Sequence, residues 1–132
     1  MLECLILGDS LAVGVGLAKP ACEVHAQVGI NSHDWNQKFS GIDLAAGAVL
    51  ISLGSNDHAG VRTEAELRRL RQRTRGQRVF WVMPNIKPEV QRLVARIAKE
   101  NGDQVIQTRS LSADKVHPTP VGYRELAQKF QR

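Results

Sequence analysis

The feature that most constrains the fold of this chain is a fivefold alternation of short apolar runs with helix-like segments. The apolar runs cover residues 2–7, 22–27, 48–53, 77–83 and 104–108, and the helical patterns cover 10–18, 32–39, 63 onward, 88–100 and 120–131. The third apolar run is uninterrupted, as expected of a strand that is buried on both faces. Strands that alternate with helices favour a parallel sheet covered by helices on both faces.

Right-handed crossovers between these strands leave a flavodoxin-like strand order, 2-1-3-4-5, as the simplest topology. The predicted fold class is therefore α/β, a three-layer α/β/α sandwich around a five-stranded parallel sheet. We expect residues 1–132 to form a single domain, because this length is sufficient for one hydrophobic core. In such sheets, ligands bind beyond the carboxyl ends of the strands, at the switch point between the first and third strands.

The N-terminal segment indicates where the protein is expected to act. Met1-Leu2-Glu3-Cys4 has no basic residues ahead of its apolar stretch, so we interpret it as a first strand and not as a signal peptide. No apolar stretch approaches the ~20 residues needed to span a bilayer. We therefore expect a cytoplasmic protein, although export by a non-standard route would leave the same sequence. Cys4 and Cys22 lack metal-ligand spacing and are expected to be buried thiols, not a disulfide.

The net charge of +5 is concentrated in an arginine-rich segment, residues 62–78. Its seven arginines are Arg62, Arg68, Arg69, Arg71, Arg73, Arg75 and Arg78. Such a segment can contact nucleic acid or another polyanion. Leu67 and Leu70 instead indicate an amphipathic helix with a solvated basic face, and the segment has no aromatic residues to stack on bases. We therefore do not expect a nucleic-acid partner.

Two segments far apart in the chain carry the residue types of an activated hydroxyl nucleophile. Ser10 directly follows the first apolar run, within Gly8-Asp9-Ser10-Leu11. Asp114 and His117 lie three residues apart, a spacing that can place both side chains on the same side of one turn. A serine hydroxyl needs a base within hydrogen-bond reach, so His117 is the candidate base and Asp114 the acid that orients it.

Other residues can stabilise a negatively charged intermediate. Ser10 begins a predicted helix, where backbone N–H groups are free. Asn56, in the segment Gly54-Ser55-Asn56-Asp57 after the third strand, can add a side-chain amide donor. Gly29, after the second strand, can bring a bare backbone N–H close to a substrate, and Gly41 and Gly47 are alternatives for this role.

Several of these residues also have a purely structural explanation. Ser10 could cap its helix, Asn56 and Asp57 could form a turn, and Asp114 could cap its own turn. Asp9 and Asp57 are interpreted as hydrogen-bond acceptors that shape their loops. His58, with His33 and Trp35, is a candidate either for a pocket wall or for the surface, and His25 for a structural contact.

In order along the chain, these blocks resemble the four motif blocks of the SGNH (GDSL) hydrolase family. The blocks are Gly8-Asp9-Ser10-Leu11, Gly29, Gly54-Ser55-Asn56-Asp57 and Asp114-Lys115-Val116-His117-Pro118. The resemblance covers essentially the whole chain and implies ester hydrolysis through an acyl-enzyme. It implies that Ser10 is the nucleophile, His117 the base and Asp114 its acid, with an oxyanion hole made by the Ser10 N–H, the Gly29 N–H and the Asn56 side chain. Lys115 stands where many family members have glycine.

The expected function is that of a serine esterase acting on short, acetyl-type acyl esters of a carbohydrate or cell-wall glycan. Little sequence remains for a lid or a deep lipid channel, which favours an open site. A lipase, thioesterase or acyltransferase uses the same residues. A non-catalytic binding or assembly module and a polyanion-binding protein are the alternatives from other classes. No cofactor is required, no metal site is indicated, and the sequence leaves the oligomeric state open.

Overall fold

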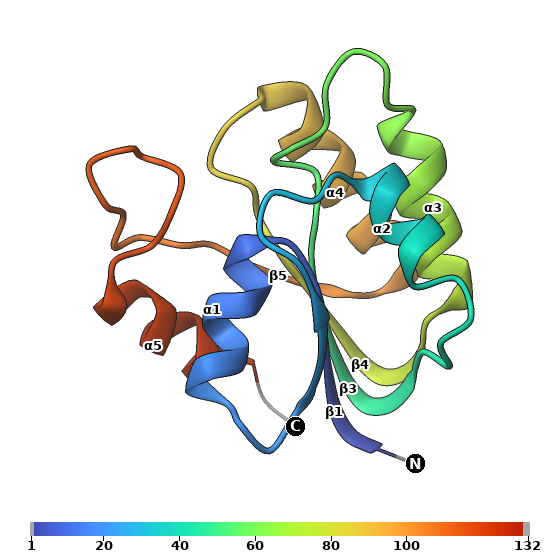
Figure 1. Ribbon diagram of the computed structural model, residues 1–132, viewed down its shortest axis with the longest axis horizontal. Helices are drawn as coiled ribbons and strands as arrows, with labels where there is room; N and C mark the ends of the chain where they lie inside the picture. The colour runs from blue at the N-terminus through green and yellow to red at the C-terminus, as the bar shows by residue number, and fades with distance from the viewer. Residues whose placement is uncertain (1, 131–132) are drawn as a thin grey trace.

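In the computed structural model, which describes residues 2–130, five parallel strands form one sheet between two layers of helices (Figure 1). The strands are β1 (Leu2–Gly8), β2 (Glu23–Ala26), β3 (Ala45–Ser52), β4 (Arg75–Val82) and β5 (Gln104–Ile106). The helices are α1 (Ser10–Ala18), α2 (Ser32–Lys38), α3 (Thr63–Arg73), α4 (Pro88–Asn101) and α5 (Pro120–Lys129). The strand order is β2-β1-β3-β4-β5 with parallel pairing throughout, which confirms the predicted fold class and topology.

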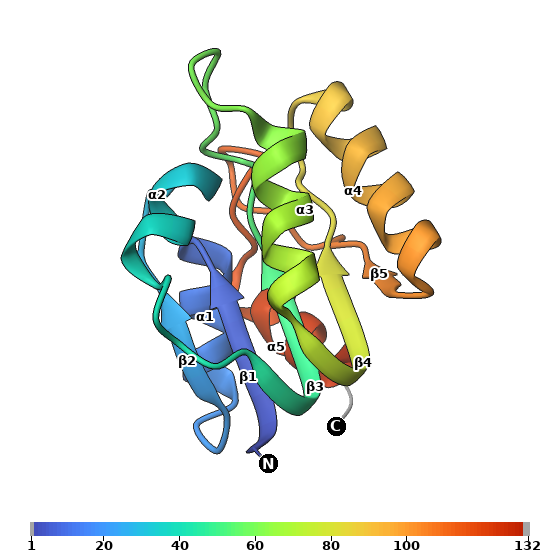
Figure 2. The same cartoon turned by 90° about the vertical axis from the view of Figure 1, so that its right-hand side faces the viewer.

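The two faces of the sheet are covered by different helices. Helices α1 and α5 lie on one face, and α2, α3 and α4 lie on the other (Figures 1 and 2). Side chains of β1 alternate between the two layers: Leu5 and Leu7 join the core beneath α2, α3 and α4, whereas Ile6 joins the core beneath α1 and α5. β1, β3 and β4 each contribute to both cores, which explains why these central strands are largely apolar.

The strand boundaries differ from the predicted ones by up to three residues. Strand β3 begins at Ala45, not at residue 48, because Ala45 and Ala46 pair with Arg75 and Gly76 of β4. Strand β5 ends at Ile106, two residues earlier than predicted. The predicted end of the last helix, Gln131, lies outside the described residues.

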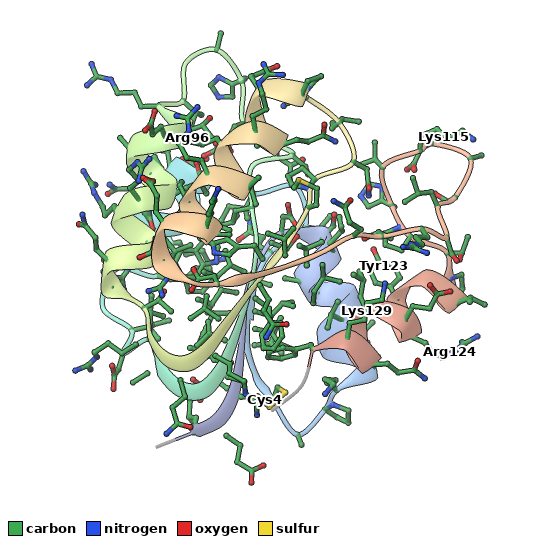
Figure 3. The ribbon with its side chains drawn as sticks, turned by 180° about the vertical axis from the view of Figure 1, so that it is seen from behind. Cys4, Arg96, Lys115, Tyr123, Arg124 and Lys129 are labelled. Atoms are coloured by element: carbon green, nitrogen blue, oxygen red, sulfur yellow. A yellow bond between two sulfur atoms is a disulfide. The ribbon has the colours of Figure 1, made fainter. Side chains whose placement is uncertain are left out.

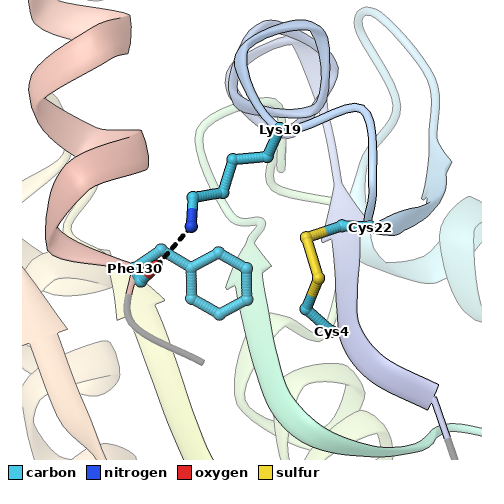
Figure 4. The surroundings of a disulfide bond; sticks show 4 residues. All are labelled: Cys4, Lys19, Cys22 and Phe130. Carbon is cyan, nitrogen blue, oxygen red and sulfur yellow. Dashed lines mark hydrogen bonds between the residues drawn. A yellow bond between two sulfur atoms is a disulfide. The ribbon is translucent and has the colours of Figure 1, made fainter.

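Cys4 and Cys22 form a disulfide, so the expectation of two free thiols was wrong (Figure 4). The register of the sheet explains the pairing: Leu5 of β1 lies opposite Glu23 of β2, and the two cysteines each come one residue earlier. Their Cα atoms are 4.9 Å apart. Disulfides are typical of oxidising compartments, whereas the predicted cytoplasmic location rests on the N-terminal segment alone and stays a prediction.

Arginines of the 62–78 segment mostly bind other parts of the same chain. Arg68 donates to Glu64 and Glu100, and Arg71 makes a two-pronged contact with Asp103. Arg73 donates to three backbone carbonyls in the segment between α2 and β3, and Arg75 pairs with Asp43. Leu67 and Leu70 are fully buried, as the amphipathic pattern predicts. Much of the basic charge of α3 therefore holds α3 to its neighbours.

Candidate active site

The turn from β1 into α1 can be made only by glycine. Gly8 has a φ of 143°, and a Cβ at this position would lie 1.9 Å from the carbonyl oxygen of Ser52. Asp9 follows, and its backbone N–H donates to that same carbonyl over 2.9 Å. Its carboxylate caps α1 by accepting from the N–H of Leu11. Asp9 is thus the N-cap, which leaves the hydroxyl of Ser10 available for another partner.

The partner of Ser10 is His117, 107 residues further along the chain. The Oγ of Ser10 lies 2.9 Å from Nε2 of His117, and Nδ1 of His117 lies 2.7 Å from Oδ2 of Asp114. The carboxylate therefore favours the tautomer with a proton on Nδ1, which makes Nε2 the acceptor for the serine hydroxyl. The side chains of His117 and Asp114 are 46% and 50% exposed, so this end of the site is open to solvent.

The loop that carries Asp114 and His117 is held by hydrogen bonds within itself. Oδ1 of Asp114 accepts from the backbone N–H groups of Val116 and His117, and the N–H of Ser112 donates to the carbonyl of His117. The hydrogen bond from His117, followed by the backbone N–H groups, keeps the pKa of the Asp114 carboxyl well below its usual value. Asp114 therefore stays ionised and can stabilise a positively charged imidazole.

Lys115 occupies the outer end of this loop (Figure 3). Its φ of 62° lies in the left-handed region, where a glycine is favoured. This backbone geometry gives a physical reason for the glycine that many SGNH family members have here.

The carboxyl group of Asp9 is fully buried beside the candidate nucleophile. Oδ1 accepts from the hydroxyl of Ser52 over 3.0 Å, whereas Oδ2 has no partner among the described residues. Burial raises the pKa of Asp9 to about 6, because the hydrogen bonds from Ser52 and Leu11 offset only part of the desolvation. Burial, together with the charges of Asp9 and Asp114, raises the pKa of Tyr123, which packs against Gly14 of α1.

Asn56 lies in the loop after β3, at the same edge of the sheet. The loop begins at Gly54, whose φ is 113°. The side-chain amide of Asn56 donates over 3.1 Å to the carbonyl of Ile30, in the loop after β2. An amide carries two N–H donors, and the second has no partner among the described residues. Asp57 accepts from both the backbone N–H and the hydroxyl of Ser32, which ties this loop to the start of α2.

Gly29 lies beyond the carboxyl end of β2, next to the residue that Asn56 binds. It has a φ of 78°, and its role in an oxyanion hole stays a prediction. Gly41 and Gly47 lie before and within the first part of β3, toward the opposite edge of the sheet. Their positions make them poorer candidates than Gly29.

Two grooves adjoin the Asn56 loop. One, of about 810 Å³, is lined by Asn56, His58, Lys87, Arg92, Arg96 and residues of both α3 and α4. The other, of about 440 Å³, is lined by His33 and His58 together with Arg62 and Arg69. Trp35 is fully buried and donates to the carbonyl of His25, so it belongs to neither a pocket wall nor the surface. A larger hollow of about 970 Å³ contains Gly47 and Phe130 and shares no residue with the site.

Within residues 2–130, no cluster of three or more histidine, cysteine, aspartate or glutamate side chains is arranged to hold a metal ion. No helix in the described part of the chain is long and apolar enough to cross a bilayer.

The geometry thus shows a three-layer α/β/α fold. At the carboxyl edge of its sheet, His117 contacts both Ser10 and Asp114. Three solved structures of limited sequence identity share the fold. A GDSL-like lipase from Bacteroides thetaiotaomicron aligns over 96% of this chain and 84% of its own, with a TM-score of 0.68 and 17% identity. A candidate acylhydrolase from Bacteroides fragilis aligns over 96% and 83%, with a TM-score of 0.64 and 14% identity.

A candidate GDSL-like lipase from Parabacteroides merdae aligns over 98% of this chain and 93% of its own, with a TM-score of 0.70 and 14% identity. Neither a protein-family model nor a curated protein matches the sequence. The chain therefore has the fold of GDSL-like lipases, in agreement with its resemblance to the SGNH (GDSL) motif blocks.

Sequence reasoning missed several residues that hold the site in place. Ser52 binds Asp9, Asn85 donates over 2.9 Å to the carbonyl of Val116, and Lys87 binds the Asn56 loop. Their shared signal is position: Ser52 ends β3, and Asn85 and Lys87 follow β4, so all three lie at the carboxyl edge of the sheet. Polar residues at strand ends outside the motif blocks are the ones to examine in such a sequence.

Proposed function

We propose that this protein is a serine esterase that hydrolyses short-chain acyl esters through an acyl-enzyme on Ser10. The observation that carries the proposal is the continuous contact from Ser10 Oγ to His117 Nε2 and from His117 Nδ1 to Asp114, over 2.9 and 2.7 Å. This is the arrangement that activates a hydroxyl nucleophile. The description of the three structural neighbours as lipases or an acylhydrolase supports the same reaction class.

In the proposed reaction, His117 Nε2 takes the proton of Ser10 as Oγ bonds to the ester carbonyl carbon. The carbonyl electron pair moves onto oxygen, and this oxyanion accepts hydrogen bonds from the N–H groups of Ser10 and Gly29 and from the second N–H of Asn56. The bond to the alcohol oxygen then breaks, and that oxygen takes the proton from His117. Water repeats the sequence on the acyl-enzyme, releasing the acid and restoring Ser10.

The surroundings of the site favour a small acyl group and a polar alcohol. His117 and Asp114 are half exposed, which is consistent with an open site that has no lipid channel. The groove beside Asn56 is lined by charged side chains of both signs, including Lys87, Glu89 and Arg96. A carbohydrate hydroxyl suits such a lining better than a long alkyl chain does. An acetylated glycan is therefore the proposed substrate class.

The proposal is tested by measuring hydrolysis of acetyl, butyryl, octanoyl and palmitoyl esters of one alcohol. Wild-type rates are expected to be highest for acetyl and butyryl esters, and Ser10→Ala is expected to lower kcat by roughly 10⁴-fold or more. Ser40→Ala, at an exposed serine before β3, is the matched control and should keep the wild-type rate. A wild-type rate in Ser10→Ala would show that Ser10 is not the nucleophile. Rates that rise with acyl length would favour the lipase or thioesterase alternative.

A further inference from the structure

We propose that Lys87 is a positioning residue that fixes Asn56 for oxyanion stabilisation. This inference rests on the proposed function. The Nζ of Lys87 donates to the carbonyl of Ser55 over 3.0 Å and also to the carbonyl of Asp57. These two carbonyls belong to the residues on either side of Asn56, so one ammonium group binds both flanks of the proposed donor.

The loop after β3 has few other constraints on the Asn56 side chain. A backbone hydrogen bond from Asp57 to Gly54 closes the turn, and the carboxylate of Asp57 is held by Ser32. The Asn56 amide itself is anchored at one N–H, by Ile30. Hydrogen bonds from a charged donor are stronger than neutral ones, so the ammonium is suited to fixing the direction of the second N–H.

The local backbone around Lys87 is unfavourable for a lysine. Lys87 is the N-cap of α4 with a φ of 61°, a left-handed conformation that favours glycine. It also places a cation at the positive end of the helix dipole. Its side chain makes no cap contact to α4 and instead reaches across to the loop after β3. Lys87 thus has both an unfavourable backbone conformation and an unfavourable charge for its position in the helix. Such a residue at the edge of a site is expected to have a role in that site.

Lys87 borders a groove that Asn56 also lines, in addition to binding the Asn56 loop. Lys87 and Asn56 line the same groove of about 810 Å³. Lys87 is half-buried there, which protects its hydrogen bonds from exchange with water. Lys87 makes no hydrogen bond to Ser10, His117 or Asp114, so a substitution there is expected to change the Asn56 loop and to leave those three contacts in place.

The test compares Lys87→Met, Lys87→Arg and Lys99→Met with wild type on a short-chain ester. Lys99 is an exposed lysine on the same helix and serves as the matched control. Lys87→Met is expected to lower kcat by about 10- to 100-fold, because a misplaced N–H donor stabilises the oxyanion much less. KM is expected to stay within about twofold. Lys87→Arg keeps a charged donor and should recover part of kcat, whereas Lys99→Met should match wild type.

A double variant separates positioning from general destabilisation. If Lys87 acts through Asn56, adding Lys87→Met to Asn56→Ala should lower kcat by no more than about twofold further, since the donor is already gone. Hydrogen exchange at the backbone amide of Asp57 should speed up in Lys87→Met and not in Lys99→Met. Additive losses of kcat, or unchanged kcat in Lys87→Met, would overturn this role.

The outcomes also distinguish this inference from the proposed function. If Ser10→Ala and Asn56→Ala lose activity while Lys87→Met keeps full activity, only the positioning role of Lys87 is rejected. Absence of ester hydrolysis in the wild-type protein, or full activity in Ser10→Ala, rejects the function and this inference together.

Discussion

The two segments that meet at the candidate site are built in opposite ways. The serine segment is short and buried: Gly8 and Asp9 pack directly against Ser52, with backbone hydrogen bonds of 2.9 Å to β3 and 3.0 Å to the loop after β2. The histidine segment, between β5 and α5, is long and partly exposed, and it is shaped mainly by its own hydrogen bonds. Figure 3 shows its outer end, at Lys115, projecting from the molecule.

This difference assigns separate physical tasks to the two segments. Ser10, the proposed nucleophile, is held by the sheet itself, so substitutions around it are expected to lower the free energy of unfolding. His117, the proposed base, is held by a loop turn and by a contact from Asn85 to Val116, so substitutions there are expected to change the site and leave the sheet intact. Substitutions in the serine segment should therefore affect global stability more than those in the histidine loop.

The largest effect is expected from Gly8→Ala. A methyl group at this position would meet the Ser52 carbonyl at 1.9 Å, and the φ of 143° is unfavourable for alanine. Steric overlap and backbone strain together should lower the free energy of unfolding by about 4 kcal/mol, measured by urea denaturation. Gly41→Ala is the control, because nothing lies within 4 Å of a Cβ there. Equal stability of the two variants would contradict the packing of this turn.

A smaller effect is expected from protonation of Asp9. The folded state keeps this proton up to about pH 6, whereas the unfolded chain releases it near 3.8. The folded state thus binds more protons in this window, and the free energy of unfolding falls as pH rises through it, by about 3 kcal/mol in total. That stability is present below pH 4 and lost above pH 6.

Asp9→Asn should remove this contribution, since asparagine does not titrate. Urea denaturation at pH 4, 5, 6 and 7 is expected to show a shallower decrease of stability with pH than in the wild type. The slope is the informative quantity, because the new amide group also changes the hydrogen bonding around Oδ2. The same slope in both proteins would show that the carboxyl group is not buried as described.

The smallest effect is expected from Lys115→Gly in the histidine loop. Glycine relieves the left-handed backbone at a φ of 62° but increases the entropy of the unfolded chain, so the net change in stability should be within about 1 kcal/mol. Esterase kcat should stay within about twofold. Lys99→Gly, in a helical backbone, should instead destabilise by about 1 kcal/mol. A larger loss of stability in Lys115→Gly than in Lys99→Gly would contradict the loop geometry.

The sequence predicts the fold and the meeting of Ser10 with His117, because both follow from strand–helix alternation and from the rule that strand ends share one edge. The sequence does not by itself predict contacts that depend on the distance between side chains. The Cys4–Cys22 bond follows from the register of β1 against β2, which places the cysteines side by side. The sequence signal for this bond is a cysteine near the start of each of two strands that are expected to pair.

Lys87 illustrates the same limit. In the sequence it precedes Pro88 and has the pattern of an ordinary surface lysine ahead of a helix. Its two hydrogen bonds to the Asn56 loop depend on the packing of β3 beside β4, and on a left-handed backbone that the pattern of residue types does not reveal. Patterns identify which residue types reach the edge of the sheet, and packing decides which of them touch.

The disulfide has a consequence for how the protein can be inactivated by proteolysis. Cys4 and Cys22 close a covalent ring that contains β1, α1 and Ser10. A single cut between residues 5 and 21 would leave both fragments joined, so Ser10 would stay covalently linked to the sheet. No such ring encloses the loop between β5 and α5, where one cut would detach His117 or α5 from the chain that carries Ser10. In an oxidising environment, a protease would therefore disrupt the candidate site most easily by cutting the loop that carries His117.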